Sequence, residues 1–368
     1  MSTFKDLKWT IIGAGNGGQS VAGHLGLMGF NVNIYDICVE SIDGIKKQGG
    51  VFLEGAVKGF GSVYATNDLK KAVSEADIIM VITPALAHGQ VAKDCASYLK
   101  DNQMIVLHPG ATFGALAFYK ALQDENCKAD VTIVETSTLI YACRLSKPGT
   151  ACILGIKDRL QIAALPAVKT GQAVKVLKTA YSQIEGLDNV MMTSLDNTNP
   201  IIHPPATLFS TSLVESNKDW LFYWDGITTS IGNFIEAMDH ERLNIAEKLG
   251  YKMDAIKDQY RTEYHAAGEN LSEIFKNTDA YSGVYGQKTL ETRYILEDIP
   301  MGLVPFVSLG KKLGVKVERM ETIIKLSEFM LQKDLTSYGR SFKNMGLNGM
   351  SIDEIMDLII NGENDRKS

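Results

Sequence analysis

The chain has 368 residues, of which 45% are hydrophobic and 22% charged, and it carries a net charge of −6 with a pI near 5.6. This length fits roughly two domains of ordinary size, and the composition is typical of a globular protein. The negative charge argues against nucleic acid and anionic membrane surfaces as partners, and no apolar run approaches the roughly 20 residues that span a bilayer.

The first predicted elements surround a glycine-rich turn. Residues 10–12 form a short apolar run typical of a buried parallel strand. The run leads into GAGNGG, which satisfies the pattern G-x-G-x-x-G, and a helical pattern follows. In such a turn the first glycine allows the tight bend, the second lets the backbone approach a pyrophosphate, and the third lets helix and strand pack closely. The helix N-terminus offers N–H groups to the phosphates. We therefore predict a dinucleotide site formed by Gly13, Gly15, Asn16, Gly17 and Gly18.

A second predicted strand, residues 32–35, ends on Asp36, which lies 23 residues after Gly13. A carboxylate at this distance can accept hydrogen bonds from both ribose hydroxyls, and it would repel a 2′-phosphate. The sequence therefore favours NAD over NADP as cofactor. The alternative is a glycine-rich turn without a ligand, and the two strands and the acid around the turn argue against it.

The rest of the first half alternates strands and helices. We predict strands at residues 51–53, 63–66, 76–82, 104–107, 131–135, 141–145, 151–156 and 190–193, and helices at 41–47, 68–75 (with Asn67 as cap), 91–99, 114–122 and 169–184. This alternation is typical of an α/β fold with a doubly wound Rossmann sheet. Ligands bind at the carboxyl ends of such strands. The loops that follow the strands should therefore face the cofactor, among them residues 108–110, 135–137 and the pair Thr83 and Pro84.

After about residue 194 strand patterns disappear and helical periodicity takes over. We predict helices at residues 205–216, 227–249, 253–264, 269–276, 302–313, 317–331 and 352–360. The helix at 227–249 is long and amphipathic, and its polar face is expected to carry Asp239, Glu241, Arg242 and Glu247. We therefore predict a Rossmann domain at residues 1–193 and an all-helical domain at 194–368.

One candidate for acid–base chemistry lies where the two predicted domains join. The segment DNTNPIIHPP, residues 196–205, contains His203 directly before two prolines. Because prolines disrupt a helix interior, a helix here is either kinked or begins only at Pro204. Asn199 and Pro200 can mark a helix start. His203 is either a catalytic acid or base, or a hydrogen-bonded residue of the junction.

A second candidate segment is LETRYILEDIPMGL, residues 290–303. Arg293 can bind a carboxylate through two parallel hydrogen bonds, which lysine does less well, although a surface salt bridge is the simpler explanation. Asp298 precedes Pro300 by two residues and could cap a helix. It could instead accept from a histidine ring N–H, which would fix the tautomer and support the imidazolium.

These two motifs, NTNPIIHP and TRYILEDIPMGLVP, together with the N-terminal G-x-G-x-x-G, resemble the opine dehydrogenases. The resemblance is to the octopine/nopaline type and to the bacterial N-(1-carboxyethyl)-amino-acid dehydrogenases such as the N-(1-D-carboxyethyl)-L-norvaline enzyme. It extends over the whole chain through GAGNGGQ, LHPGATFGAL, ETSTLIYACR and DGITTSIG. It implies a helical domain like the C-terminal domain of 6-phosphogluconate dehydrogenase.

Enzymes of this family reductively condense an α-keto acid, often pyruvate, with the amino group of an amino acid, using NADH or in some cases NADPH. The resemblance implies that His203 is the acid/base, Asp298 its orienting partner and Arg293 the clamp for a substrate carboxylate, with Asn199 as a supporting contact. Protonating the departing keto oxygen calls for an acid poised near neutral pH, which a His–Asp pair supplies.

Two other substrate contacts are open. Glu135 could meet the ammonium or guanidinium group of an amino donor, or only cap its strand. The aromatic cluster at residues 220–226 could line the donor pocket, pack in the core or form a dimer contact.

Several expectations concern the setting of the protein. The five cysteines are odd in number and form no C-x-x-C, so we expect reduced thiols in a cytosol and no metal site. The first eight residues lack the apolar segment of a secretory signal. The family suggests a homodimer. The competing functions are a ketopantoate-reductase-like or glycerol-3-phosphate-dehydrogenase-like enzyme, which would use a lysine acid, and an NAD-binding regulator without turnover.

Overall fold

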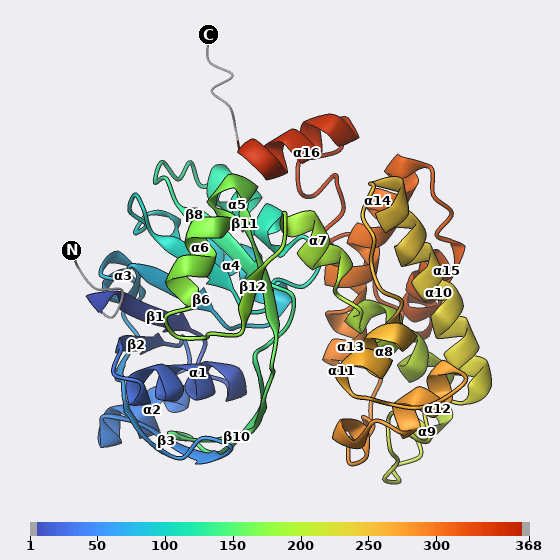
Figure 1. Ribbon diagram of the computed structural model, residues 1–368, viewed down its shortest axis with the longest axis horizontal. Coiled ribbons are helices and arrows are strands. Elements are labelled where there is room, and N and C mark those ends of the chain that lie inside the picture. The colour runs from blue at the N-terminus through green and yellow to red at the C-terminus, as the bar shows by residue number, and fades with distance from the viewer. Residues whose placement is uncertain (1–5, 363–368) are drawn as a thin grey trace. The chain divides into compact units, whose positions relative to one another are not determined.

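The computed structural model describes residues 6–362. The chain divides into two compact units: unit 1 contains the residues up to Ser194 and those from Asp353 onward, and unit 2 contains residues 195–352 (Figure 1). Unit 1 ends at Ser194, one residue after the predicted domain boundary at residue 193. Within residues 6–362, no helix combines the length and apolar character that a bilayer crossing requires.

The C-terminal helix departs from the predicted domains. Helix α16 (Ile352–Asn361) was expected in the helical domain, but it groups with unit 1. The helix buries Ile355 and Ile359 on one face. An amphipathic pattern shows that a helix has a buried face, but it does not specify which surface covers that face. For this reason the sequence could not assign α16 to a unit.

The core of unit 1 is an eight-stranded sheet in the order β12-β11-β8-β7-β6-β1-β2-β5. Neighbouring strands are parallel except β11 and β8. The strands are β1 (Lys8–Ile12), β2 (Asn31–Tyr35), β5 (Tyr64–Thr66), β6 (Ile78–Val81), β7 (Met104–Leu107), β8 (Thr132–Thr136), β11 (Leu160–Leu165) and β12 (Ile184–Gly186). Strands β6 and β7 are buried apolar runs, as expected where helices flank a parallel sheet. The predicted Rossmann fold is confirmed.

The helices of unit 1 connect these strands. They are α1 (Asn16–Leu27), α2 (Val39–Gln48), α3 (Leu69–Ser74), η2 (Ala85–Ala87), α4 (His88–Ala96), α5 (Gly114–Asp124), η3 (Ala167–Lys169), α6 (Thr170–Leu177) and α7 (Val190–Leu195). Three local predictions were wrong. The cap of α3 is Asp68, whose carboxylate accepts from the N–H of Lys71, and not Asn67. Residues 190–193 are helical. The predicted helix at 169–184 stops at Leu177, because residues 184–186 pair with β11, a strand that was not predicted.

A second sheet of four strands packs against helix α1. Its order is β4-β3-β10-β9, and its strands are β3 (Gly50–Gly55), β4 (Gly59–Ser62), β9 (Tyr141–Lys147) and β10 (Thr150–Ile156). The approach is close: a Cβ atom on Gly61 would lie 1.9 Å from the carbonyl oxygen of Gly23, in the middle of α1. Strands β9 and β10, both predicted as strands, pair antiparallel and form a hairpin. Most of these strands were predicted, but their separate sheet was not.

Unit 2 is helical, as predicted. Its elements are α8 (Asn199–Phe209), α9 (Thr211–Val214), α10 (Thr229–Lys248), α11 (Ile256–Glu263), α12 (Leu271–Lys276), η4 (Asp279–Tyr281), α13 (Arg293–Leu296), the π-helical turn η5 (Ile299–Leu303), α14 (Val304–Leu313) and α15 (Glu318–Leu331). Helix α10 begins where the Oγ1 of Thr228 accepts from the N–H of Ile231, and it ends just before Gly250, whose φ is +83°.

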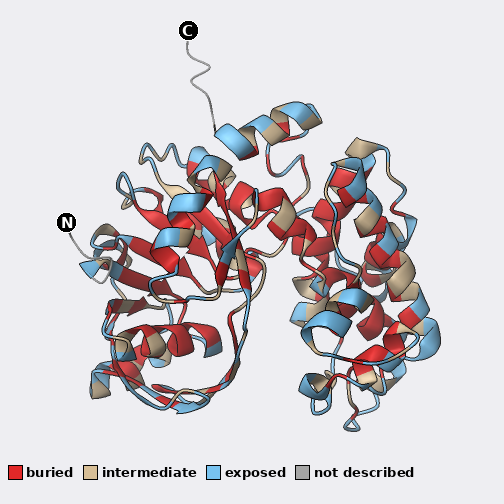
Figure 2. Cartoon of the chain, viewed as in Figure 1, coloured by how far each residue is buried: buried red, intermediate tan, exposed pale blue. Residues whose placement is uncertain are grey.

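Of the four residues predicted for the polar face of α10, Asp239, Glu241 and Arg242 are buried and Glu247 is exposed. Buried and exposed stretches alternate along the helices of unit 2 (Figure 2). Arg242 is fully buried, and its guanidinium donates to Asp239 at 2.7 Å and to the carbonyl oxygens of Leu195 and Asp254. Glu241 is buried as well and accepts from the backbone N–H groups of residues 319 and 320, at the start of α15. Because other segments cover both sides of α10, its charged residues hold neighbouring backbone in place instead of facing solvent.

Replacing Arg242 with alanine is expected to lower the free energy of unfolding by about 3–5 kcal/mol, because Asp239 would be left as an uncompensated buried charge. Arg261→Ala, which breaks an exposed pair with Asp258, should cost no more than about 1 kcal/mol. Denaturant unfolding followed by fluorescence and circular dichroism checks both variants. Equal midpoints for Arg242→Ala and Arg261→Ala would contradict the structural role of Arg242.

Candidate active site

The glycine-rich turn joins β1 to α1, and each of its outer glycines is required for a different reason. Gly13 has a φ of +104° and donates its N–H to the carbonyl oxygen of Tyr35 at 2.8 Å. A Cβ atom on Gly18 would lie 1.7 Å from the carbonyl oxygen of Gly13, so helix and turn could not pack with any larger residue. A Cβ atom on Gly15 would meet no atom within 4 Å. The open space therefore lies beside the glycine that was predicted to face the pyrophosphate.

The first turn of α1 is suited to an anion. Its N-cap is Gly15, which has no side chain to occupy the N–H groups, and the turn contains no acidic residue. Gly17 is buried there, against Ile82 and Leu139. Asn16, predicted to bind the cofactor, uses its Oδ1 to accept from the N–H of Leu145 at 3.0 Å. This bond ties the turn to strand β9.

Gln19 is a buried residue of this region that sequence reasoning missed. Its amide donates to the carbonyl oxygen of Ala14 and accepts from the N–H of Gly149. The side chain therefore fixes the turn against the β9–β10 hairpin. No motif in the sequence could have indicated this contact, because Gly149 lies 130 residues away.

Asp36 lies at the carboxyl end of β2, as predicted. Its carboxylate accepts from the N–H of Ala14 at 2.6 Å and from the N–H of Cys38 at 2.8 Å. These bonds hold the carboxylate beside the turn while it keeps further acceptor capacity for ribose hydroxyls. The neighbouring Ile37 is 84% exposed.

Thr83 and Pro84 follow β6, the neighbour of β1 in the sheet. The hydroxyl oxygen of Thr83 is buried and has no hydrogen-bond partner within residues 6–362. The side chain lies close to the turn, because its Cγ2 would be 3.1 Å from a Cβ atom on Gly13. A buried hydroxyl without a partner is costly. Its position fits a polar group of a bound cofactor, and Pro84 is exposed at the start of η2.

His108 and Glu135, in the neighbouring loops, have structural partners. His108 is buried, and desolvation lowers its pKa to about 3. Its Nε2 accepts from the N–H of Ile140, so its Nδ1 carries the proton and donates to Thr136. Glu135 is fully buried and accepts from the N–H of Ala115 and from the hydroxyls of residues 193 and 194. This placement favours a structural role for Glu135 over contact with an amino donor.

In unit 2, the structure brings His203 and Asp298 together. The Nδ1 of His203 lies 2.7 Å from the Oδ2 of Asp298, and both residues are buried. The other ring nitrogen, Nε2, makes no hydrogen bond to any residue in the described part of the chain. Because Asp298 accepts at Nδ1, it fixes the tautomer of the neutral ring and leaves Nε2 available to accept a hydrogen bond.

Two unusual helical segments position this pair. Helix α8 begins at Asn199 and continues through Pro204 and Pro205, so the alternative in which it begins at Pro204 was wrong. Asp298 directly precedes the π-helical turn η5, and its carboxylate bonds His203 instead of capping a helix. A Cβ atom on Gly302 of η5 would lie 2.5 Å from the Cβ of Pro200, so the two segments are in close contact. Such π-turns are frequent at functional sites.

Arg293 is the first residue of the short helix α13, Asn199 lies on α8, and both residues are exposed. The guanidinium carbon of Arg293 lies 5.8 Å from the ring centroid of Tyr294, and it forms no ion pair with any described residue. The surface salt bridge considered for Arg293 is therefore not formed. Asn199 is the first residue of α8. Its role as a supporting contact stays a prediction.

The aromatic cluster at residues 220–226 divides between the site and the core. Phe222 contacts the ring of His203 edge-on, with the centroids 5.9 Å apart. Tyr223 is buried and stacks on Tyr281 at 4.2 Å. Trp224 is 53% exposed, with the ammonium of Lys276 over its ring.

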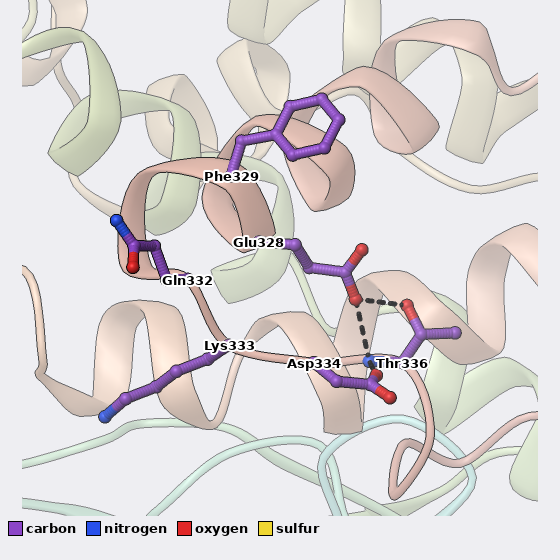
Figure 3. Close-up of a pocket in the computed structure, with 6 residues that line it drawn as sticks. All are labelled: Glu328, Phe329, Gln332, Lys333, Asp334 and Thr336. Carbon is purple, nitrogen blue, oxygen red and sulfur yellow. Dashed lines mark hydrogen bonds between the residues drawn. The ribbon is translucent and has the colours of Figure 1, made fainter.

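A separate surface pocket of about 420 Å³ lies at the end of α15 (Figure 3). The carboxylate of Glu328 accepts there from the N–H and the hydroxyl of Thr336, and Asp334 accepts from the N–H groups of residues 336 and 337. These acids fold their own loop. The pocket residues include neither His203 nor Asp298.

Comparison with known proteins agrees with this geometry. A family model described as NAD/NADP octopine/nopaline dehydrogenase, alpha-helical domain, matches residues 186–331, and one described as NAD-dependent glycerol-3-phosphate dehydrogenase N-terminus matches residues 8–147. An opine dehydrogenase from Arthrobacter sp. (strain 1C) is 34% identical over 346 residues, which cover 93% of this chain and 96% of that protein.

Two solved structures of octopine dehydrogenase share the fold. One, with NADH and L-arginine, has a TM-score of 0.79 at 20% identity and covers 98% of this chain and 100% of that one. The other, with NADH and pyruvate, has a TM-score of 0.77 at 21% identity and covers 95% of this chain and 98% of that one.

Proposed function

Because this chain belongs to the opine dehydrogenase family, we propose that it catalyses the NADH-dependent reductive condensation of an α-keto acid, pyruvate in the first instance, with the amino group of an L-amino acid. The product is an N-(1-carboxyalkyl) amino acid, and the enzyme is an oxidoreductase acting on a CH–NH bond. The observation that carries this proposal is the buried His203–Asp298 pair. Within residues 6–362, the Nε2 of His203 makes no hydrogen bond and the guanidinium of Arg293 forms no ion pair.

The residues of unit 2 supply the acid–base chemistry. Arg293 binds the carboxylate of the keto acid through two parallel N–H donors. The amine attacks the keto carbon and gives up one proton, His203 Nε2 supplies a second proton, and the keto oxygen takes up both and leaves as water. Asp298 accepts from Nδ1–H and stabilises the imidazolium before that transfer. Asn199 provides a supporting polar contact to the substrates. The nicotinamide cofactor supplies the hydride that reduces the resulting C=N bond.

The residues of unit 1 bind the dinucleotide. Gly13, Gly15 and Gly18 shape the turn, and the first N–H groups of α1 meet the pyrophosphate. Asp36 accepts from the ribose hydroxyls, and Thr83 directs its buried hydroxyl to the cofactor. A 2′-phosphate beside the carboxylate of Asp36 would be repelled, which favours NAD.

Asp36→Asn is expected to raise the KM for NADH by about 10- to 100-fold, because hydrogen bonds to a charged acceptor contribute about 1.5–3 kcal/mol. The preference for NADH over NADPH should fall at the same time, because the repelling charge is removed. Steady-state rates with each cofactor measure both effects. A KM for NADH within twofold of the wild type would show that Asp36 serves only the backbone bonds to Ala14 and Cys38.

NADH oxidation with pyruvate and a panel of amino acids tests the function itself. An opine dehydrogenase requires both substrates for turnover. Oxidation with the keto acid alone would indicate a hydroxy-acid dehydrogenase, as in the ketopantoate-reductase-like alternative. Binding of NADH without turnover on any pair would indicate a regulator.

We also propose a reducing, cytosolic location and a homodimer. The five cysteines, which all lie within residues 6–362, are unpaired, and two of them are buried. Free thiols are typical of reducing compartments. Light scattering on the purified protein tests the dimer.

A further inference from the structure

Tyr294 is the residue that contacts both functional groups of the proposed site. Its ring stacks on the imidazole of His203, with the centroids 4.0 Å apart and the planes 14° apart. The guanidinium carbon of Arg293 lies 5.8 Å from the same ring centroid. Within residues 6–362, no hydrogen bond or ion pair joins His203 directly to Arg293.

The bond from Asp298 does not by itself fix the imidazole of His203. One hydrogen bond at Nδ1 sets the tautomer, but the ring can still rotate about that contact and carry Nε2 away from the substrate. A flat ring parallel to the imidazole removes this freedom. Phe222 supports the arrangement, because it contacts Tyr294 edge-on at 5.0 Å and His203 at 5.9 Å.

The position of Arg293 matters for the same reaction. A keto acid held by its carboxylate on Arg293 presents its keto oxygen to Nε2 only if the two side chains keep their relative position. A misplacement of about 1 Å can cost a hundredfold in rate. A cation over an aromatic face is attracted to it, so the ring of Tyr294 restrains the guanidinium as well.

We propose that Tyr294 is a positioning residue that holds His203 and Arg293 in register for the condensation. This inference rests on the proposed function, because it assigns Tyr294 to the same acid–base step. The ring face performs this task, and the phenol hydroxyl is not required for it.

Three single variants test the proposal. Tyr294→Phe keeps the ring and should retain kcat and KM within about threefold. Tyr294→Leu removes the flat face and should lower kcat by about a hundredfold, raise the KM for the keto acid about tenfold, and leave the Kd for NADH unchanged. Tyr285→Leu, at a tyrosine that is 65% exposed, is the matched control and should behave as the wild type.

A double mutant separates a shared role from two unrelated effects. If Tyr294 acts through Arg293, the loss caused by Tyr294→Leu should be smaller in an Arg293→Lys background than in the wild type. If Tyr294→Leu lowered activity by the same factor in both backgrounds, the shared role of Tyr294 would be overturned. A Tyr294→Phe variant as impaired as Tyr294→Leu would also overturn the proposal, because the hydroxyl would then be the acting group.

A measurement on the wild type does not depend on how the Tyr294 variants fold. Stacking predicts that the ring C–H signals of His203 in the NMR spectrum, assigned by their loss in His203→Asn, are shifted upfield relative to those of the exposed His240. Unshifted signals would overturn the proposal. Failure of the proposed function gives a different result from failure of the role of Tyr294, because the wild type itself would then not oxidise NADH with a keto acid and an amino acid.

Discussion

Replacing His203 with asparagine is expected to lower kcat by about 10²- to 10⁴-fold, the range associated with loss of a general acid. Asparagine cannot transfer a proton at Nε2, but its amide can still donate to Asp298. This choice keeps the buried carboxylate paired, so the fold should be retained. The Kd for NADH should not change, because the dinucleotide turn belongs to unit 1.

The measurement is steady-state NADH oxidation with both substrates, together with NADH binding by fluorescence. His240→Asn is the matched control, because His240 is exposed on α10 and should tolerate the same change. Retention of full turnover in His203→Asn would remove the imidazole from the mechanism. Loss of NADH binding in that variant would point to a folding defect.

Replacing Arg293 with alanine is expected to reduce kcat/KM for the keto acid by about 10²- to 10³-fold. Two charge-assisted hydrogen bonds to the carboxylate are lost, and each contributes about 1.5–3 kcal/mol, although such contributions are seldom additive. The change should appear mainly in the KM for the keto acid if binding is lost, and in kcat if orientation is lost.

Arg293→Lys distinguishes charge from geometry. Lysine keeps the positive charge but cannot form the two parallel bonds, so it should recover only part of the loss. Arg261→Lys on the exposed face of α11 is the control for the substitution itself. If Arg293→Ala left kcat/KM for every keto acid unchanged, the clamp would have to be another group.

The parts of the fold that depend on neighbouring residues in the sequence could be predicted. The glycine turn, the acid after β2 and the apolar runs of β6 and β7 each reflect a nearby steric or hydrophobic requirement, and each was located within about two residues. The long helix α10 was also visible through its period. In the site, the pairing of His203 with Asp298 was expected from the family resemblance, and the distance of 2.7 Å is consistent with it.

The features that depend on distant packing could not be predicted. Strand β11 joins the sheet antiparallel to β8, and nothing in its own residues indicates that partner. The polar residues of α10 were expected on a solvent-facing side of the helix, but three of them are buried. A periodic pattern does not show whether other segments cover the polar side of a helix. Tyr294 was visible in the motif, but its stack on a histidine 91 residues earlier is a tertiary contact.

The most direct test of the central claim is analysis of the product made from isotopically labelled amino acid, pyruvate and NADH by the wild type and by His203→Asn. The wild type should join the labelled nitrogen to the former keto carbon, with one NADH oxidised for each product formed, and the variant should make almost none. Formation of a hydroxy acid with the labelled amino acid unchanged, or equal product from the two proteins, would contradict condensation at the His203–Asp298 pair.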